Sequence, residues 1–438
     1  MSDPGRPGFL GLWSGIGLVA ANMIGAGVFL SAGFMIQEMS PGWILIAWVV
    51  GMVLNMAGAR AYAELASLLP RSGGEYRYLS DLAHPLLGYL AGWASLLVGF
   101  SAPIAINAIG ASEFLATVIG LPDPRVVATV LIAALTAFHS VGLVTSKRTQ
   151  DLLIALKVVL LLGFVVLGLA LGSWRWPTWT PPHGSTHFAA GPFFGSLFWI
   201  AFAFTGWNAA AYAAGDFRNP ARDAPRAMLI GCAAVGALYV LVNWVFVANL
   251  TPADALGVVK TQRPILGHAV SQVLIGPTGA GMMSILVALA MISCMSAMVM
   301  VGPRVYATMA EDGFLPRWMA ARAGRPPIGS VVFQSVIAVA IVWTHSLKNA
   351  LGNVGAVLIL FSALAAASVL VVRWRRPDLP RPRRFAQLAA ALYVVASAWT
   401  LVFGFRRLDS TLLVWVGSIT VVALVAYAAT VRVRRRAG

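Results

Sequence analysis

Three long stretches of this sequence carry no charged side chain. No Asp, Glu, Lys or Arg occurs in residues 7–37, 176–215 or 264–303. About 20 apolar residues cross the hydrocarbon core of a bilayer as a helix, so each stretch can hold a complete spanning helix. With 59% hydrophobic and 11% charged residues, the chain is expected to be an all-α polytopic membrane protein, and a soluble globular domain is excluded.

Hydropathy predicts twelve transmembrane helices. The spans are expected at 10–38, 42–69, 85–119, 124–144, 150–172, 191–216, 224–251, 277–310, 329–346, 351–372, 385–404 and 411–430. Two of them, 85–119 and 277–310, exceed what a bilayer needs and predict tilted or extended helices. The first span is too long, and too interrupted by glycine, for a cleavable signal peptide.

The positive charge is unevenly distributed between the predicted loops. The chain has a net charge of +16. With twelve spans, only Arg125, Arg175, Lys260, Arg263, Lys348, Arg406 and Arg407 fall on the side opposite the termini. This asymmetry predicts an inner-membrane protein whose N-terminal tail, 1–9, and basic C-terminal tail, 431–438, are cytoplasmic. The arginine cluster at 373–384 and the C-terminal tail suit anionic lipid headgroups, and nucleic-acid binding is not expected.

Two hydrophobic spans are interrupted at their middle. The first contains Ile24-Gly25-Ala26-Gly27, and the sixth contains Phe202–Asn208 with Gly206. Glycine costs about 1 kcal/mol relative to alanine in a helix interior, so these segments invite unwinding. Hydrocarbon cannot solvate the freed backbone groups, which must therefore line a cavity or contact protein. Glycines also serve close helix packing, but a matched pair of breaks is typical of a secondary transporter's substrate site.

The spacing of the breaks predicts an internal repeat. They lie in spans one and six, five helices apart, which gives two five-helix repeats, 10–172 and 191–372, with helices 385–430 appended. Because five is odd, the second repeat enters the membrane from the opposite side, and the repeats have inverted topology.

The unwound segments offer backbone groups suited to a zwitterion. Amides near Ala26 and Gly27 begin a half-helix and favour a carboxylate. Carbonyls near Met23, and those of Phe202 and Thr205 in the sixth span, favour an ammonium group. The sequence therefore predicts a site that binds the backbone of an α-amino acid.

Lys157 lies two helical turns inside predicted span five. It lies roughly 10 Å from the nearer end of span five, at 1.5 Å per helical residue. An ionisable group at that depth indicates function. The long side chain equally allows the ammonium to snorkel to the headgroups, and the residues alone favour neither interpretation. Arg60, Glu64 and Arg304, near span ends, fit either gate ion pairs or loop contacts.

Four motifs together resemble a known family. They are Ile24–Phe29 in span one, Tyr62–Leu65 with Pro70–Tyr76 at the end of span two, Asp216–Arg226 after span six, and Arg304–Ala307 with Glu311–Pro316 at the end of span eight. The set is similar to the amino acid–polyamine–organocation transporters, especially bacterial relatives of the L-type amino acid exchangers. The resemblance implies a LeuT-type 5+5 inverted repeat with discontinuous helices 1 and 6, and alternating access to a central site.

The resemblance also assigns residues. It implies substrate binding by Met23, Ile24, Gly25, Ala26, Gly27, Phe202, Ala203, Thr205, Trp207 and Asn208. It implies that Lys157 replaces a sodium ion between spans one, five and eight, beside Ser293 and Ser296. Relatives often carry serine at the position of Ala26, and two acidic residues where this chain has Gly215-Asp216.

These observations predict a sodium-independent carrier of neutral L-amino acids, working by exchange or proton symport. A carrier of cationic amino acids or polyamines is the alternative, but it needs acidic groups near mid-membrane, and none is evident at either break. A membrane-embedded enzyme would need paired carboxylates, a histidine cluster or a nucleophile. The sequence leaves the particular amino acid open.

No cofactor or metal is expected, because His183 and His187 lie in a loop without matching ligands. The only cysteines, Cys232 and Cys294, fall inside predicted helices. The L-type exchangers of animals that this chain resembles are linked to a heavy subunit through a cysteine in the outer loop after span three. The matching loop here, 120–125, contains no cysteine, so the resemblance implies no covalently attached accessory subunit. The protein is predicted to be a monomer or a weak homo-oligomer.

Overall fold

The computed structural model describes residues 8–428 except 9, 122, 142, 174, 180–187, 189, 251–265, 322–325, 346, 406–416, 418–419, 422–423 and 425–426. The described residues are nearly all helical. Their one β-type contact is an isolated parallel bridge between Leu10 and Phe217. This confirms the expected all-α fold class.

The helices follow the predicted spans closely. In chain order they are α1 Leu12–Met23, α2 Ala26–Met35, α3 Pro41–Leu68, α4 Glu75–Leu82, α5 Pro85–Ala94, a π-helix Ser95–Ser101, α6 Ala102–Leu115, α7 Pro124–Val141, α8 Leu143–Leu171, α9 Ala190–Ala203, α10 Ala209–Tyr212, a 3-10 turn Ala214–Asp216, α11 Pro220–Asn249, α13 Leu266–Glu311, a 3-10 turn Arg317–Met319, α14 Ile328–Thr344, α15 Leu347–Arg375 and α16 Arg384–Phe405.

Nine helical segments within the described residues are long and apolar enough to cross a membrane. Two shorter apolar helices, α9 and α14, occupy predicted spans six and nine. The predicted twelfth span, 411–430, and the two tails lie mostly outside the described residues. The chain is therefore a multi-pass membrane protein, and the count of twelve spans stays a prediction.

Two details of the long helices differ from the sequence-based expectation. The third span contains a π-helical turn at 95–101, which no local residue pattern predicted. The eighth span extends back to Leu266, but it kinks at Gly276, where φ is +74°. The kink coincides with the predicted start of that span at 277, so the helical turns before it are the unexpected part.

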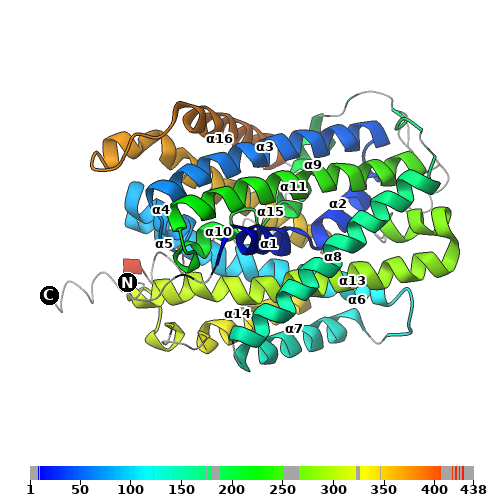
Figure 1. Cartoon of the computed structure of the whole chain (residues 1–438), viewed down its shortest axis with the longest axis horizontal. Helices are drawn as coiled ribbons and strands as arrows, with labels where there is room; N and C mark the ends of the chain where they lie inside the picture. The colour runs from blue at the N-terminus through cyan, green and yellow to red at the C-terminus, as the bar shows by residue number, and fades with distance from the viewer. Residues whose placement is uncertain are drawn as a thin grey trace.

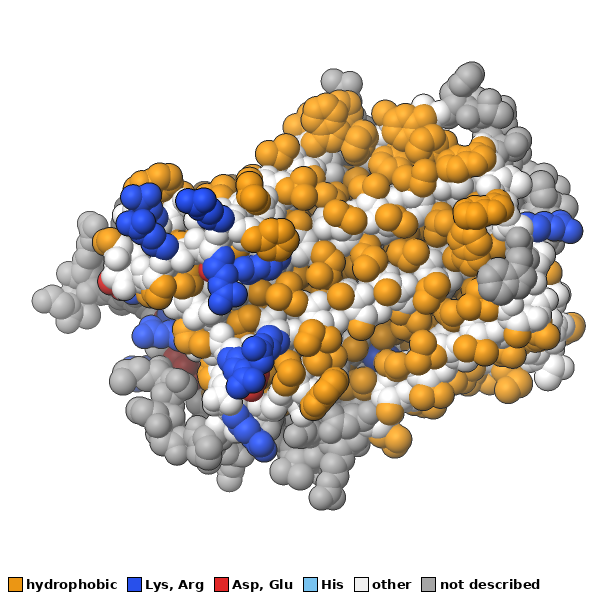
Figure 2. Space-filling model, turned by 45° about the horizontal axis from the view of Figure 1, so that its top comes forward, with side chains coloured by type: hydrophobic (Ala, Val, Ile, Leu, Met, Phe, Trp, Pro, Cys, Tyr) orange, Lys and Arg blue, Asp and Glu red, His pale blue; other side chains and the backbone are white. Residues whose placement is uncertain are grey.

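The first broken span lies at the centre of the bundle. Figure 1 shows α1 in the middle of the molecule, and α1 packs against α11 and α13. In the apolar 18-residue stretch of α1 and α2, 100% of the residues are buried inside the protein, whereas in that of α7 17% are buried. Figure 2 shows hydrophobic side chains over most of one face, with Lys and Arg gathered toward one end. Polar backbone at the break is thus surrounded by protein, as a membrane interior requires.

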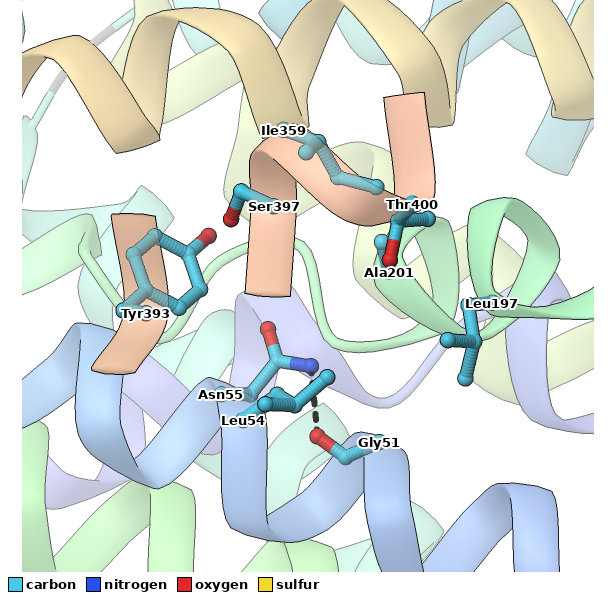
Figure 3. A pocket seen from close by; sticks show the side chains of 9 residues that line it. All are labelled: Gly51, Leu54, Asn55, Leu197, Ala201, Ile359, Tyr393, Ser397 and Thr400. Carbon is cyan, nitrogen blue, oxygen red and sulfur yellow. Dashed lines mark hydrogen bonds between the residues drawn. The ribbon is translucent and has the colours of Figure 1, made fainter. Parts of the chain in front are cut away.

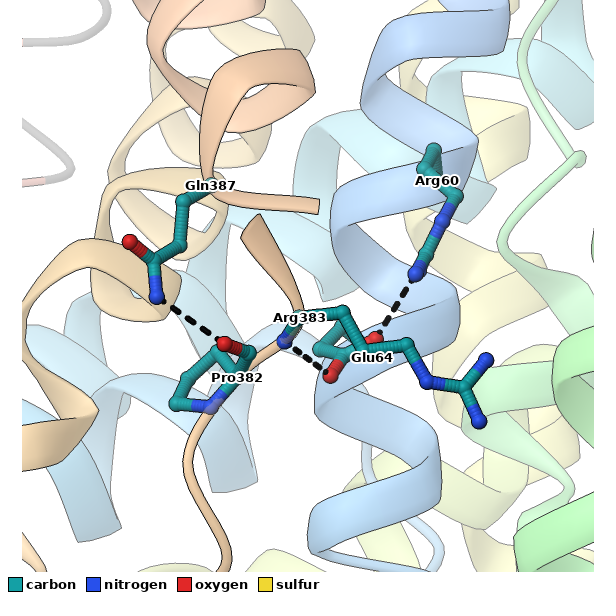
Figure 4. Close-up of polar contacts among 5 residues, drawn as sticks. All are labelled: Arg60, Glu64, Pro382, Arg383 and Gln387. Carbon is teal, nitrogen blue, oxygen red and sulfur yellow. Dashed lines mark hydrogen bonds and ion pairs between the residues drawn. The ribbon is translucent and has the colours of Figure 1, made fainter. Parts of the chain in front are cut away.

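The carboxylate of Glu64 on α3 binds the start of the appended helix α16. Glu64 of α3 accepts hydrogen bonds from the Arg60 guanidinium at 2.9 Å and from the backbone N–H of Arg383 at 2.8 Å (Figure 4). Pro382, just before Arg383, accepts from Gln387 at 3.0 Å. Glu64 and Arg60 therefore form a structural junction where α16 begins, which corresponds to the loop-contact interpretation of these two charges.

Candidate functional site

The first predicted break is present. Helix α1 ends at Met23, and α2 begins at Ala26. Ile24 and Gly25 between them have extended backbones, with φ of −74° and −153°. The linker and the flanking turns are buried. The end of α1 therefore presents carbonyls, and the start of α2 presents amides, in the middle of the bundle.

The second predicted break is present as well. Helix α9 ends at Ala203, a turn covers 204–208, and only the four-residue α10 follows before the chain reaches Asp216. Gly206 has φ of +108°, a backbone region that side chains disfavour. A Cβ atom there would lie 2.6 Å from the carbonyl carbon of Asn22. The second break is thus packed against the end of α1.

The two breaks are also in contact where α2 begins and α9 ends. A Cβ atom on Gly27 would lie 2.3 Å from the Cα of Ala203. Backbones of α2 and α9 are therefore in direct contact, and Gly27 makes this approach possible. A Cβ atom on Gly25 would instead lie 2.6 Å from Asn107 Oδ1 of α6 and from Cys294 Sγ of α13.

Side chains from other helices bind the free backbone groups of the first break. The amide of Ala26 donates to Asn107 Oδ1 at 2.8 Å. The carbonyl of Met23 accepts from the Tyr239 hydroxyl at 2.5 Å. In this structure both groups are thus bound by protein, because α6 and α11 each supply a polar side chain at the break.

Lys157 reaches the same break from α8. Its ammonium donates to the carbonyls of Ala21 at 2.6 Å and Ile24 at 3.1 Å. The residue is 1% exposed, so its side chain does not snorkel to the surface. A cation at the carboxyl end of α1 is electrostatically matched to the negative end of the helix dipole.

The two serines expected near Lys157 are both buried on α13. The hydroxyl of Ser296 lies 2.8 Å from Nε2 of His139, on α7. The hydrogen bonds of Lys157 that the described residues show go to Ala21 of α1 and to Ile24 in the linker after it. The Ser296 hydroxyl is thus bonded to a histidine, and the placement of Ser293 and Ser296 beside Lys157 stays a prediction.

The polar side chains that follow the second break bond away from the first break. Trp207 Nε1 donates to Asn55 Oδ1 of α3 at 3.1 Å. Asn208 donates to Glu75 Oε1 of α4 at 2.9 Å and to the Tyr212 hydroxyl at 3.0 Å. These two residues connect the second break to α3 and α4.

Phe202 and Thr205 lie at the break itself. Phe202 is 4% exposed, and its carbonyl accepts from the amide of Thr205 at 2.9 Å. The hydroxyl of Thr205 donates to the carbonyl of Ala201 at 3.3 Å. In this structure the Phe202 carbonyl is thus bound within its own turn.

A small cavity lies between α3, α9, α15 and α16 (Figure 3). Its volume is about 30 Å³, and it is lined by Gly51, Leu54, Asn55, Leu197, Ala201, Ile359, Tyr393, Ser397 and Thr400. A water needs roughly 10–15 Å³ by this measure, so the cavity suits one or two waters and is too small for an amino acid. Asn55 joins it to the second break through Trp207.

Contacts at the basic end of the molecule hold the two broken spans together. The amide of Leu10, before α1, donates to the carbonyl of Asp216 at 2.9 Å. The carbonyl of Leu10 in turn accepts from the amide of Arg218 at 3.0 Å. The Asp216 carboxylate pairs with Arg304 of α13 at 3.0 Å. Arg304 therefore forms the kind of ion pair expected of a gate, with a partner that the sequence did not specify.

Three polar residues at or near the breaks were missed or left undecided by the sequence. Tyr239 lacks any local signal, since a tyrosine in an apolar helix usually packs as a hydrophobe. Asn107 stood out only as a polar residue in an apolar span. Glu75 belonged to a recognised motif but had no assigned role. No group of three or more His, Cys, Asp or Glu side chains suited to a metal ion occurs among the described residues.

Comparison with known proteins covers almost the whole chain. The profile of the amino acid permease family matches residues 10–429. The large neutral amino acids transporter small subunit 2 of Rattus norvegicus is 27% identical over 90% of this chain and 75% of its own length. The Asc-type amino acid transporter 1 of Mus musculus is 26% identical over 90% and 76%. The b(0,+)-type amino acid transporter 1 of Homo sapiens is 25% identical over 89% and 81%.

Proposed function

Because this chain belongs to the amino acid permease family, we propose that it is a secondary carrier of neutral L-amino acids that works by alternating access without sodium. The observation that carries this proposal is the meeting of two discontinuous helices at the centre of the bundle, with the end of α1 and the start of α2 both buried there. Helix ends of opposite polarity suit the ammonium and carboxylate of one α-amino acid.

Neutral substrates are supported by the apolar surroundings and by the relatives. Met23 and Phe202 are buried hydrophobes at the breaks. Two of the relatives reported above are named for large neutral amino acids and for an Asc type. A second positive charge on the substrate would need a carboxylate, and the buried Glu75 lies beyond the second break rather than in it.

The proposed substrate contacts are those of the two breaks. The carboxylate binds the amides of Ala26 and Gly27 at the start of α2, and the ammonium binds the carbonyls of Met23, Phe202 and Thr205, with Ile24 and Gly25 in the linker beside it. In the present conformation Asn107, Tyr239 and the Thr205 amide hold the groups of Ala26, Met23 and Phe202, and they release these groups when the substrate binds. Ala203, Thr205, Trp207 and Asn208 shape the opposite wall. Because Gly27 touches Ala203 in the present conformation, substrate binding requires α2 and α9 to separate.

Sodium independence follows from Lys157. Its ammonium occupies the carbonyls of Ala21 and Ile24, which a sodium ion between α1, α8 and α13 would otherwise use. Two unit charges 4 Å apart repel by about 4 kcal/mol at an effective dielectric of 20, which opposes sodium binding beside the lysine.

The remaining organisation is proposed on the same basis. The repeats 10–172 and 191–372 form the moving unit, and 385–430 form a support for it. The protein lies in the inner membrane with both tails in the cytoplasm, because the basic end shown in Figure 2 then faces anionic lipid. It functions without a covalently attached subunit.

The decisive experiment is uptake by proteoliposomes that contain the purified full-length protein. Radiolabelled neutral, cationic and acidic amino acids and polyamines are offered in sodium or choline buffer, with unlabelled substrate inside or absent. We expect saturable uptake of neutral amino acids that is equal in the two buffers. Uptake restricted to polyamines or cationic substrates, or a strict need for sodium, would refute the proposal. Faster uptake with substrate inside indicates exchange, and acceleration by an inward proton gradient indicates symport.

A further inference from the structure

One carboxylate close to the second break is almost completely buried. Glu75, the first residue of α4, is 5% exposed. Its Oε1 accepts from the Tyr62 hydroxyl at 2.8 Å and from Asn208 Nδ2 at 2.9 Å. Its Oε2 accepts from the Tyr212 hydroxyl. The three donors come from α3 and from the segment around α10, so this carboxyl group joins three separate parts of the fold.

All three donors are uncharged. The nearest arginine along α4, Arg77, pairs with Asp312 at 3.1 Å, and Glu75 takes part in none of the ion pairs found among the described residues. A carboxylate removed from water without a counter-charge favours its neutral form. Glu75 is therefore suited to taking up a proton.

The pKa of Glu75 reflects this environment. Burial raises the pKa above the usual value of a glutamate, and the bonds from Tyr212, Tyr62 and Asn208 oppose that rise in part. The other ionisable groups that interact with this carboxyl group are phenols: Tyr62, Tyr78, Tyr212 and Tyr393. Helices α5 and α15 also pack against α4, and their Tyr89, Arg373 and Arg375 are not among the groups that bond to Glu75.

The position of Glu75 connects it to the moving part of the proposed carrier. Asn208 and Tyr212 flank α10, the short helix that follows the second break. Gly74 precedes Glu75 with φ of +51°, and a Cβ atom there would lie 2.2 Å from the Tyr212 ring. Hydrogen bonds to an ionised carboxylate are about twice as strong as neutral ones. An ionised Glu75 thus holds α10 against α4, and a neutral Glu75 holds it less firmly.

We propose that Glu75 is a proton-binding site of this protein, and that its protonation releases α10 so that the second broken helix moves more readily. One proton from solution adds to a carboxylate oxygen, and no other covalent bond forms or breaks. The effect on movement rests on the proposed transport function, whereas the proton site itself does not.

The proton site is tested first without transport. Because the folded-state pKa of Glu75 is raised, its contribution to stability is present at low pH and is lost as pH rises through that folded-state pKa. The detergent-purified wild type should therefore lose melting temperature with rising pH relative to Glu75→Gln, which cannot titrate. If the difference in melting temperature between the wild type and Glu75→Gln stays constant with pH, the proton site is overturned, whether or not the protein transports.

The link to movement is tested by counterflow of a neutral amino acid against pH. We expect the wild-type rate to rise as pH falls, and the rate of Glu75→Gln to be independent of pH. Tyr62→Phe removes a donor to the ionised form and should move the midpoint upward by about 1–2 pH units. Tyr78→Phe is the matched control: it removes a hydroxyl near the same group, but Tyr78 makes no hydrogen bond to Glu75, so the midpoint should not move.

The outcomes separate the two proposals. Absence of amino acid transport at every pH refutes the proposed function, and the melting comparison still decides the proton site. A wild-type profile that Glu75→Gln reproduces overturns the inference while transport stands. If Glu75→Gln does not fold, equal midpoints for Tyr62→Phe and Tyr78→Phe overturn it instead.

Discussion

Gly27 and Ala203 are in direct backbone contact. A Cβ atom added to Gly27 would stand 2.3 Å from the Cα of Ala203, which is closer than any real pair of carbon atoms can approach without bonding. The two discontinuous helices therefore meet through a residue that has no side chain. Any molecule that binds between them must push α2 and α9 apart, and the glycine determines how closely they return.

Substitution of this glycine tests the contact. Gly27→Ala should reduce transport by at least tenfold, because the added methyl group keeps α2 and α9 apart. Uptake in proteoliposomes gives the rate, and size-exclusion chromatography in detergent checks folding. The control is Gly163→Ala on α8, where an added Cβ meets nothing within 4 Å; it should transport normally. Wild-type transport by Gly27→Ala would show that the contact does not matter for function.

Lys157→Ala should abolish transport, with or without sodium. The substitution leaves the buried carbonyls of Ala21 and Ile24 without their donor, at a cost of about 1–3 kcal/mol for each unsatisfied group. Uptake is measured in sodium and in choline buffers, with Leu156→Ala as control because Leu156 is 37% exposed on the same helix. Normal uptake by Lys157→Ala would remove the lysine from the mechanism.

The ion pair between Asp216 and Arg304 should have only a modest effect. Their side chains are 30% and 21% exposed, and exposed pairs contribute about 0–1 kcal/mol. Asp216→Asn should therefore change the counterflow rate by no more than about fivefold, and the change should shrink at high salt. The charge-swapped variant with Asp216→Arg and Arg304→Asp should restore the rate. Complete loss of transport in Asp216→Asn would mean that the pair does more than hold two segments together.

Denaturing gels should show no reducible complex. Cys232 and Cys294 are the only cysteines of the chain, and both are buried free thiols. Membranes prepared with a thiol-blocking reagent should give the same band with and without reductant. Leu121→Cys, in the loop before α7, is a positive control for crosslinking to a second cysteine. A reducible band of higher mass in the wild type would contradict the expectation of no covalent subunit.

Local sequence patterns located both breaks correctly, because glycine placement and hydropathy act on the residues themselves. Gly25 and Gly206 lie where the helices end. The sequence did not determine the direction of the polar side chains. The sequence did not predict that the side chains of Trp207 and Asn208 bond to α3 and α4. It also did not predict that Ser296 bonds to His139. Such choices depend on which helix lies opposite, which a single segment does not encode.

The sequence by itself determined the membrane class, the position of the spans that the structure describes, and the two breaks. Each follows from interactions within about 20 residues, the length that a bilayer imposes on a helix. Only the tertiary structure decided which groups bind the freed backbone. Ala26 meets Asn107 across 81 positions of the chain, and Met23 meets Tyr239 across 216. The burial of Lys157 was decided in the same way, because its neighbour Val159 on α8 is 64% exposed while Lys157 faces α1. A hydrogen bond requires atoms within about 3 Å, and packing of helices distant in sequence is what brings them there.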